Sequence, residues 1–449
     1  MAVATIHWLF GSNRTPALGC DRVESFPESD YFVAMNRGHM YKVGLETAKA
    51  TTADFESLRS TFLQILQETP RETSYVSVLT SADRDEWAKV SQVFLNLYSA
   101  RHAKQFQARD DIIKLSQRNN DFVKTVEECL FIINLEEATP ETASERADVF
   151  LLDDNSNRWL DKTLSFIVCA NGVSSIWGEH TMVDGTTFDG LIKAISSATV
   201  EPTRAFEAPT ASSATSKSDF TYLPITLPPS MPEYIKTLQV QHRTAHEGYT
   251  LANLRHTSYA AAYLRKHKLP PKSIIQLVVQ IAVRRILGHN PLGAVDVVSQ
   301  RPFRGGRTDM IYVMTDPVQA FCAAAEDPSV DAARKRKLLL EAVKSHARLM
   351  AMSTQGWGFR WHLMALKEML EPGEKAPGFY EDDVFVRTSQ RPICTSFTEF
   401  GLPEMGRCQP HKADIWIGVQ VLEERYVKFR NPNQSSARLI MSTESNLPS

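Results

Sequence analysis

The sequence predicts an α/β protein of two similar-sized domains. At 449 residues the chain is long enough for two hydrophobic cores. Segments typical of strands alternate with segments typical of helices along its whole length. Between residues 201 and 232 the composition shifts to Pro, Ser, Thr and Ala, which is typical of a linker. We therefore expect one domain over residues 1–200 and another over residues 233–449.

The expected first domain opens with a hairpin. Residues 30–43 hold two apolar runs on either side of Asn36-Arg37-Gly38, which has the composition of a turn. Residues 54–67 place apolar side chains three and four positions apart, the spacing of an amphipathic helix. Residues 75–79 read Tyr-Val-Ser-Val-Leu and are expected to form a strand, followed by a helix that contains Trp87.

Further elements are expected on both sides of the linker. Residues 164–169 form an apolar strand pattern, Asn171-Gly172 a turn, and residues 175–177 the strand that follows. Beyond the linker we expect two long helices and one half-buried strand, over residues 272–287, 331–352 and 414–421.

The composition excludes several classes of protein. The formal charge of −2 gives no overall basic excess for a nucleic-acid partner. The six cysteines include no C-x-x-C pair, which favours free thiols in a reducing compartment and argues against a metal site. We find no apolar run of membrane-spanning length and no N-terminal signal sequence. The expectation is a cytoplasmic protein.

The segment His180-Thr181-Met182-Val183-Asp184-Gly185 carries the clearest chemical signal. A carboxylate four positions after an imidazole can orient the ring, which leaves the other ring nitrogen to act as a general base. The histidine also follows a predicted strand directly, a rigid place from which to present a reactive side chain. Such a string arises by chance in about 3% of chains of this length. Most histidines are surface or hydrogen-bonded core residues.

Together with five other segments, this one resembles the motifs of the carnitine/choline acyltransferase family. The similar motifs, in the family's order, are FGxxRxP, TSxxRxxWA, NRWxDKT, EHxxxDG, FxxGRTD and STS. They correspond to residues 9–16, 80–88, 157–163, 179–185, 303–309 and 394–396. The resemblance covers nearly the whole chain.

The resemblance implies a two-domain chloramphenicol-acetyltransferase-like fold with an active-site tunnel at the domain interface. It implies that His180 is the general base, that Asp184 orients it, and that Ser396 donates a hydrogen bond to the oxyanion. Transfer is expected to be direct, with an acyl-CoA or phosphopantetheine thioester as co-substrate and no bound cofactor. From the residues alone, Ser396 is equally well read as a turn cap, and Arg307 with Asp309 as a structural ion pair.

Several positions depart from the family pattern at the acceptor site. Trp361 stands where carnitine enzymes have an arginine that binds the carnitine carboxylate, and Val295 stands in place of a tyrosine. Met310 replaces a threonine, whereas Thr308 is retained, and Thr395 belongs to the STS-like triplet. We expect these five side chains to contact the substrate. An anion buried without polar partners is costly, so we predict that carnitine is not the acceptor.

The thioester site is also altered. Arg265, Lys266, Lys268 and Lys272 form a basic cluster where the family binds the phosphates of coenzyme A, but Ala261 replaces one of its lysines. The cluster therefore fits the single phosphate of a phosphopantetheine arm on an acyl carrier protein as well as coenzyme A. As an alternative, a cluster of this kind is simply a solvated face.

The first family motif begins near the N-terminus, whereas family enzymes carry an extra helical region before it. The chain is either a short divergent member or part of a longer polypeptide. Together with the altered sites, this resembles the acyltransferase domains of fungal reducing polyketide synthases, which release a polyketide onto a polyol or similar alcohol. That function in secondary metabolism is our leading interpretation.

Two alternatives remain open at this stage. The first is a carnitine or other small-alcohol acyltransferase, which needs a substitute cation such as Arg360, although that side chain is expected to point elsewhere. The second is an inactive interaction module that retains the fold. A carrier-dependent condensation enzyme is disfavoured, because Glu179 stands where such enzymes usually have a second histidine.

Overall fold

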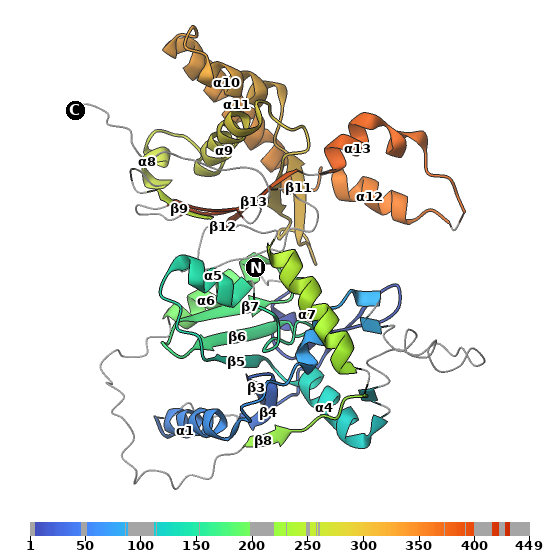
Figure 1. Ribbon diagram of the computed structural model, residues 1–449. Coiled ribbons are helices and arrows are strands. Elements are labelled where there is room, and N and C mark those ends of the chain that lie inside the picture. Colours follow the sequence, from blue (N-terminus) through green and yellow to red (C-terminus); the bar gives the residue numbers. More distant parts are fainter. Residues whose placement is uncertain are drawn as a thin grey trace. The chain divides into compact units, whose positions relative to one another are not determined.

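The computed structural model describes residues 5–45, 52–85, 87–88, 112–113, 115–151, 153–197, 220–229, 231–247, 252–256, 258, 261–371, 373–390, 392–398, 415–421 and 427–431. The chain divides into two compact units, residues 1–246 and 247–449. Each unit contains a six-stranded mixed sheet with helices packed on it, which confirms the α/β class (Figure 1).

The sheet of the first unit has the strand order β7-β6-β5-β3-β4-β8. Its strands are β3 (Tyr31–Asn36), β4 (His39–Gly44), β5 (Ile132–Glu136), β6 (Leu164–Cys169), β7 (Ser174–Gly178) and β8 (Phe220–Leu223). Strands β3, β5 and β6 are parallel, and the others pair antiparallel. The predicted hairpin is confirmed as β3–β4, and Arg37 and Gly38 both adopt positive φ, as its two-residue turn requires.

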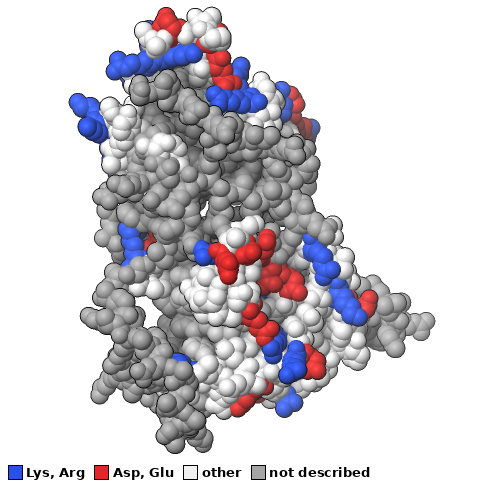
Figure 2. Space-filling model, turned by 60° about the vertical axis from the view of Figure 1, so that its left-hand side comes forward, with Lys and Arg blue, Asp and Glu red and all other residues white. Residues whose placement is uncertain are grey.

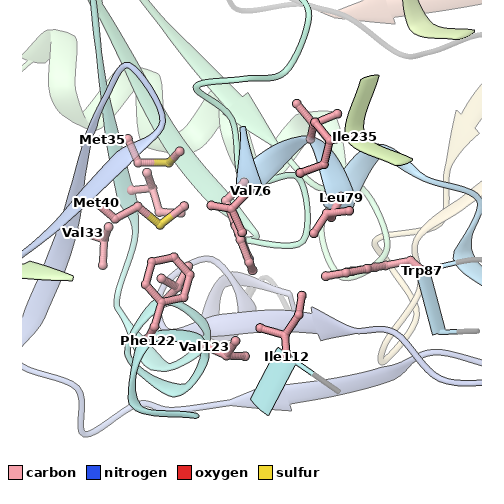
Figure 3. Close-up of a cluster of buried hydrophobic side chains, with 14 of the residues drawn as sticks. Val33, Met35, Met40, Val76, Leu79, Trp87, Ile112, Phe122, Val123 and Ile235 are labelled. Atoms are coloured by element: carbon pink, nitrogen blue, oxygen red, sulfur yellow. The ribbon is translucent and has the colours of Figure 1, made fainter. Parts of the chain in front are cut away.

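Both faces of this sheet are covered. The helices are α1 (Thr52–Glu68), α4 (Gln117–Glu128), α5 (Ala143–Leu151), α6 (Gly185–Ser197) and α7 (Met231–Glu247). Val33 and Met35 point from β3 into a core shared with α4 and α7 (Figure 3), whereas Phe32 and Ala34 point to the other face, against α1. Burial on both faces explains why β3 reads as a continuous apolar run.

Three short elements complete the first unit. They are η1 (Ile6–Trp8) and the two-stranded sheet of β1 (Ser12–Thr15) with β2 (Arg22–Ser25). Helix α7 packs on the core of the first unit through Met231, Ile235 and Leu238. The predicted linker of residues 201–232 stays a prediction, because much of it lies outside the described residues.

The expected strand at residues 75–79 is wrong. The segment forms a 3₁₀ helix, η2 (Val76–Ser81), whose side chains from Val76 to Thr80 are all buried. The Ser77 hydroxyl donates to the carbonyl of Ser156 (2.6 Å) and that of Thr80 donates to the carbonyl of Ser77 (2.7 Å). The local bond of Thr80, the long-range bond of Ser77 and burial on all sides override the alternating pattern. Trp87 is buried, and most of the helix expected around it lies outside the described residues.

The sheet of the second unit has the order β11-β10-β12-β13-β14-β9. Its strands are β9 (Ala252–His256), β10 (Val295–Ser299), β11 (Thr308–Tyr312), β12 (Ile393–Thr398), β13 (Ile415–Val421) and β14 (Val427–Asn431). Its helices are α8 (Ala261–Lys266), α9 (Pro271–Leu287), α10 (Asp316–Glu326), α11 (Ala332–Thr354), α12 (Arg360–Glu368) and α13 (Asp383–Ser389), with η3 (Gly378–Glu381). The predicted long helices are confirmed as α9 and α11, and the strand as β13.

Helices α9, α10 and α11 lie together on one side of the second sheet (Figure 1). On the molecular face shown in Figure 2, Lys and Arg side chains of the described residues are interspersed with Asp and Glu. Within the described part of the chain, no helix combines the length and the apolar character needed to span a membrane.

Candidate active site

The predicted catalytic histidine lies on a short loop between a strand and a helix. Strand β7 ends at Gly178 and helix α6 begins at Gly185. A Cβ atom on Gly178 would lie only 1.9 Å from Cζ of Phe188, so the absence of a side chain lets α6 pack against the strand end. The loop that carries His180 is thus fixed at both ends by a packed contact.

The structure brings His180 and Asp184 near one another. The His180 Nδ1 and Asp184 Oδ1 atoms are 3.7 Å apart, close enough for an ion pair but long for a hydrogen bond. The imidazole is 51% exposed and the carboxylate 9%. A half-exposed ring can reach a substrate, and such catalytic contacts often shorten only when substrate binds. The carbonyl of Asp184 accepts from Thr187 N (2.9 Å), so Asp184 opens the first turn of α6.

Glu179 holds the residues on both sides of the histidine. One oxygen of its carboxylate accepts from the backbone N–H of Thr181 (2.8 Å) and the other from the Thr181 hydroxyl (2.7 Å). Its own backbone N–H donates to the carbonyl of Thr163 (3.1 Å). Arg14 Nη1 also donates to the Glu179 carboxylate (3.1 Å).

From Arg14 a chain of ion pairs continues through the first unit. Arg14 Nε contacts Asp21 at 2.6 Å, and Arg84 Nε contacts the same carboxylate oxygen at 2.7 Å. Arg84 also pairs with Asp161, whose other oxygen accepts from Trp87 Nε1 (3.0 Å). The chain therefore joins all four family-like motifs of the first unit.

Burial perturbs the charged groups at the far end of this chain. It raises the pKa of Asp161 to about 6, against the opposing effects of Arg84 and Trp87. Burial alone would lower the pKa of Arg84, but its contacts with Asp161 and Asp21 raise it above the usual value. The Asp161 side chain is only 4% exposed, and its contact with Arg84 opposes the effect of burial on both groups.

In the second unit, four of the predicted residues share one face of the sheet. Strand pairing sets Val295 opposite both Cys394 and Tyr312, and Ser299 opposite Thr308. Directly paired residues point to the same face and side chains alternate along a strand. Val295, Thr308, Met310 and Ser396 therefore share a face, which we name the Ser396 face.

Thr395 points to the opposite, helix-covered face. It is fully buried, and its hydroxyl donates to the carbonyl of Val295 (3.1 Å), which ties β12 to β10. The structure therefore does not bring Thr395 together with the other predicted substrate contacts.

Helix α12 begins over the Ser396 face. The Phe359 ring stacks on Tyr312, with centroids 5.9 Å apart. Arg360 Nη1 lies 3.7 Å from the Met310 sulfur, and the guanidinium lies 5.5 Å from the Trp361 ring. The expectation that Arg360 points elsewhere is thus wrong, because its side chain reaches a residue of the predicted acceptor site. The Trp361 Nε1 atom is buried and has no hydrogen-bond acceptor among the described residues.

The predicted basic cluster is divided in two. Arg265, Lys266 and Lys268 are exposed at the end of α8 and just beyond it. The Lys272 ammonium instead lies 3.2 Å from the Asp296 carboxylate and donates to the carbonyl of Val297 (2.8 Å). Lys272 is therefore tied to β10, and its charge is shared with a buried carboxylate.

Three buried polar residues, on β10 and on the helices α9 and α11, were not singled out by the sequence. Asp296 is fully buried, and its carboxylate lies 3.4 Å from His346 Nε2. The other ring nitrogen of His346 lies 2.9 Å from the Ser273 hydroxyl. All three are at least 97% buried, which suits an internal brace between α9, α11 and the sheet. No spacing rule could find them, because they come from three separate elements.

The resemblance to known acyltransferases is confirmed by comparison with protein families. A family model described as choline/carnitine O-acyltransferase matches residues 1–445. A highly reducing polyketide synthase of Aspergillus luteorubrus is 25% identical over 434 residues, which cover 94% of this chain and 13% of that protein. Another, from Sordaria araneosa, is 28% identical over 410 residues, which cover 87% of this chain and 12% of that protein.

Other relatives are carnitine enzymes. The peroxisomal carnitine O-octanoyltransferase of Mus musculus is 25% identical over 402 residues, which cover 85% of this chain and 61% of that protein. Among solved structures, the first condensation domain of the CDA synthetase is similar with a TM-score of 0.34 at 10% identity, over 68% of this chain and 69% of that one. That likeness is too distant to carry an argument. Because the family model matches nearly the whole chain, this protein belongs to the choline/carnitine O-acyltransferase family, a family of acyltransferase enzymes.

Proposed function

We propose that the chain transfers an acyl group from a CoA or carrier-protein thioester to an alcohol, with His180 as general base. The observation that carries this proposal is the loop between β7 and α6. It holds a half-exposed imidazole beside a buried carboxylate, with Nδ1 and Oδ1 3.7 Å apart. This arrangement leaves the ring accessible to an acceptor hydroxyl while Asp184 offsets its charge when it is protonated.

The proposed reaction proceeds in one ternary complex. His180 takes the proton of the acceptor hydroxyl as its oxygen attacks the thioester carbonyl, and the carbonyl oxygen becomes an oxyanion. The Ser396 hydroxyl donates a hydrogen bond to that oxyanion. When the intermediate collapses, the carbon–sulfur bond breaks, and the leaving thiolate takes the proton from His180. The products are the ester and the free thiol.

The character of the Ser396 face supports an acceptor other than carnitine. On this face Met310 and the fully buried Val295 are apolar and Thr308 offers one hydroxyl, while Trp361 adds an apolar ring on α12 next to Arg360. A face of this kind suits an alcohol with an extended apolar part or several hydroxyls. The fungal polyketide synthases among the relatives support a polyketide acyl group and a role in secondary metabolism.

Arg360 favours a second candidate function. Its guanidinium lies beside Met310, at the edge of the Ser396 face. A cation at this position suits an acceptor that carries a carboxylate, which includes carnitine and other small hydroxy acids. The two candidates differ in one measurable property, the preference for a charged or an uncharged acceptor.

For the thioester, Arg265, Lys266 and Lys268 are the proposed phosphate contacts. Lys272 is bound to Asp296, whereas the other three cations are exposed, and three exposed cations suit a single phosphopantetheine phosphate as well as coenzyme A. The proposal places the reaction in the cytoplasm. The free thiols of the five described cysteines support a reducing compartment.

The test is thioester consumption with acetyl- and hexanoyl-coenzyme A and the matching pantetheine thioesters. Glycerol, longer polyols, carnitine and choline are offered as acceptors, and His180→Ala is measured in parallel. We expect ester formation with polyols that the variant abolishes. Carnitine as the preferred acceptor supports the second candidate. Equal turnover by the wild type and His180→Ala contradicts the proposed base.

A further inference from the structure

The ion-pair chain of the first unit ends at the loop that carries His180. We propose that Arg14 and Glu179 are positioning residues, which fix the His180 imidazole through Thr181. The proposal rests on the proposed role of His180 as general base. It assigns a task to two charged residues that lie 165 positions apart in the sequence.

Glu179 acts as a clamp on the catalytic loop, because its hydrogen bonds hold the loop on both sides of His180. Its two oxygens accept from the Thr181 backbone N–H and hydroxyl, and its own N–H donates to Thr163. Residues 179 and 181 flank His180, so this clamp fixes the backbone on both sides of the histidine. With the Glu179 side chain only 10% exposed, water competes little for these bonds.

Arg14 anchors that clamp to the rest of the unit. Its Nε contacts Asp21 and its Nη1 contacts Glu179, so one planar guanidinium bridges two carboxylates. A lysine has no such fork and can satisfy only one of them well. The backbone N–H of Arg14 donates to the carbonyl of Asp161 (2.9 Å), and Arg84 fixes Asp21 from the other side. The Arg14 guanidinium is thereby held in place before it reaches Glu179.

The position of the His180 ring depends on this anchor because the ring is carried by the loop backbone that Glu179 fixes. The imidazole is half exposed, and its contact with Asp184 is 3.7 Å long. A displacement of a catalytic group by about 1 Å costs on the order of 10²-fold in rate. A loop released from Glu179 leaves the substrate sites intact, so the loss falls on kcat rather than KM.

The experiment compares Glu179→Gln, Arg14→Met and Arg14→Lys with Arg158→Met as the matched control. Arg158 is a buried arginine of the same unit that pairs with Glu136 and Asp153, away from the catalytic loop. We measure kcat and KM separately, and the melting temperature of each variant. We also record the NMR signal of the ¹³C-labelled His180 ring, assigned with His180→Gln.

We expect Glu179→Gln and Arg14→Met to lower kcat by about 10- to 100-fold, with KM changed by less than about threefold. The His180 signal should broaden or split, Arg14→Lys should lose less than Arg14→Met, and the double variant should lose no more than the larger single one. Arg158→Met should lower the melting temperature while the His180 signal stays sharp.

Two results overturn the proposal. One is a kcat loss in Glu179→Gln no larger than in Arg158→Met at the same loss of melting temperature. The other is a His180 signal that all variants leave unchanged. The NMR readout needs no substrate, so it separates the two proposals. A disturbed His180 signal in a protein with no acyl transfer to any acceptor supports the positioning role and contradicts the proposed function.

Discussion

The two units present their candidate site residues in opposite ways. In the first unit His180 lies at the end of a chain of charged side chains that runs from Asp161 to Glu179. In the second unit Ser396 shares a sheet face with Val295, Met310 and Thr308, none of which carries a charge. The first unit keeps the charged residues of the family's motifs, whereas the second departs from them at the acceptor positions. The difference is the basis of our proposal that the chemistry of the family is retained while the recognition of the acceptor differs.

The largest expected effect tests the charged side of this comparison. His180→Ala should lower kcat by about 10³-fold, because the acceptor hydroxyl loses its general base. Asp184→Asn should cost less, since it keeps the size of the side chain but loses its charge. Steady-state thioester consumption at several acceptor concentrations measures both. Activity within about tenfold of the wild type in His180→Ala would locate the base elsewhere.

Ser396 tests whether the second unit contributes to the chemistry at all. Ser396→Ala should lower kcat by about 10²- to 10³-fold if its hydroxyl stabilises the oxyanion. Thr395→Val should instead lower the free energy of unfolding by about 1 kcal/mol, because it removes the bond to the Val295 carbonyl. Kinetics and denaturant unfolding of both variants distinguish the two neighbours. A larger kcat loss in Thr395→Val than in Ser396→Ala would reverse the assignment of the two faces.

The pH dependence of stability tests the buried end of the ion-pair chain, at Asp161. The pKa of Asp161 is raised from 3.8 to about 6 in the folded state. Between these values the folded protein binds more protons than the unfolded chain, so this contribution to stability is present at low pH and is lost as pH rises through about 6. The change amounts to at most about 3 kcal/mol. Between pH 4 and pH 7 the free energy of unfolding should decline less steeply in Asp161→Asn than in the wild type. If the two curves of unfolding free energy against pH ran parallel, burial would not raise the pKa of Asp161.

Packing beneath the catalytic loop is tested by two glycines. Gly178→Ala should lower the free energy of unfolding by about 1 to 3 kcal/mol, because its Cβ overlaps the Phe188 ring. Gly190→Ala, within α6 and with no atom near its added Cβ, should raise it by about 0.5 to 1 kcal/mol. Urea unfolding of the pair measures both. Equal effects of the two substitutions would contradict the packing of α6 on β7.

The smallest expected effect concerns the acceptor residues of the second unit. Trp361→Arg restores the guanidinium of carnitine enzymes and should raise carnitine turnover relative to a polyol by about tenfold, the equivalent of one charge-assisted hydrogen bond. Trp361→Phe serves as the control, since it changes the ring but adds no charge. An unchanged ratio in Trp361→Arg would place the acceptor away from this residue.

Local signals in the sequence predicted much of the fold and the centre of the site. Asn36-Arg37-Gly38 predicted the hairpin because it has the composition of a turn between two apolar runs, and the structure gives Arg37 and Gly38 the positive φ of such a turn. His180 and Asp184 were found because they are four positions apart, just after a strand. The strand expected at residues 75–79 failed because a 3₁₀ helix buried on all sides can show the same alternation of valines.

The sequence could not predict where side chains point or which residues far apart in the chain come into contact. Arg14 and Glu179 were both within recognised motifs, but no rule pairs residues 165 positions apart. Lys272 was grouped with its neighbours by charge, yet it turns toward Asp296. Ser396 and Thr395 belong to one triplet, and only the strand register shows which of them shares a face with Val295.

The most direct test of a retained base with an altered acceptor site is the ratio of polyol to carnitine turnover by the wild-type chain. It is measured with one pantetheine thioester and corrected for the His180→Ala rate. Our account predicts a ratio above one, with both activities lost in the variant. A ratio well below one would show that the Ser396 face still recognises a carboxylate and would contradict the account.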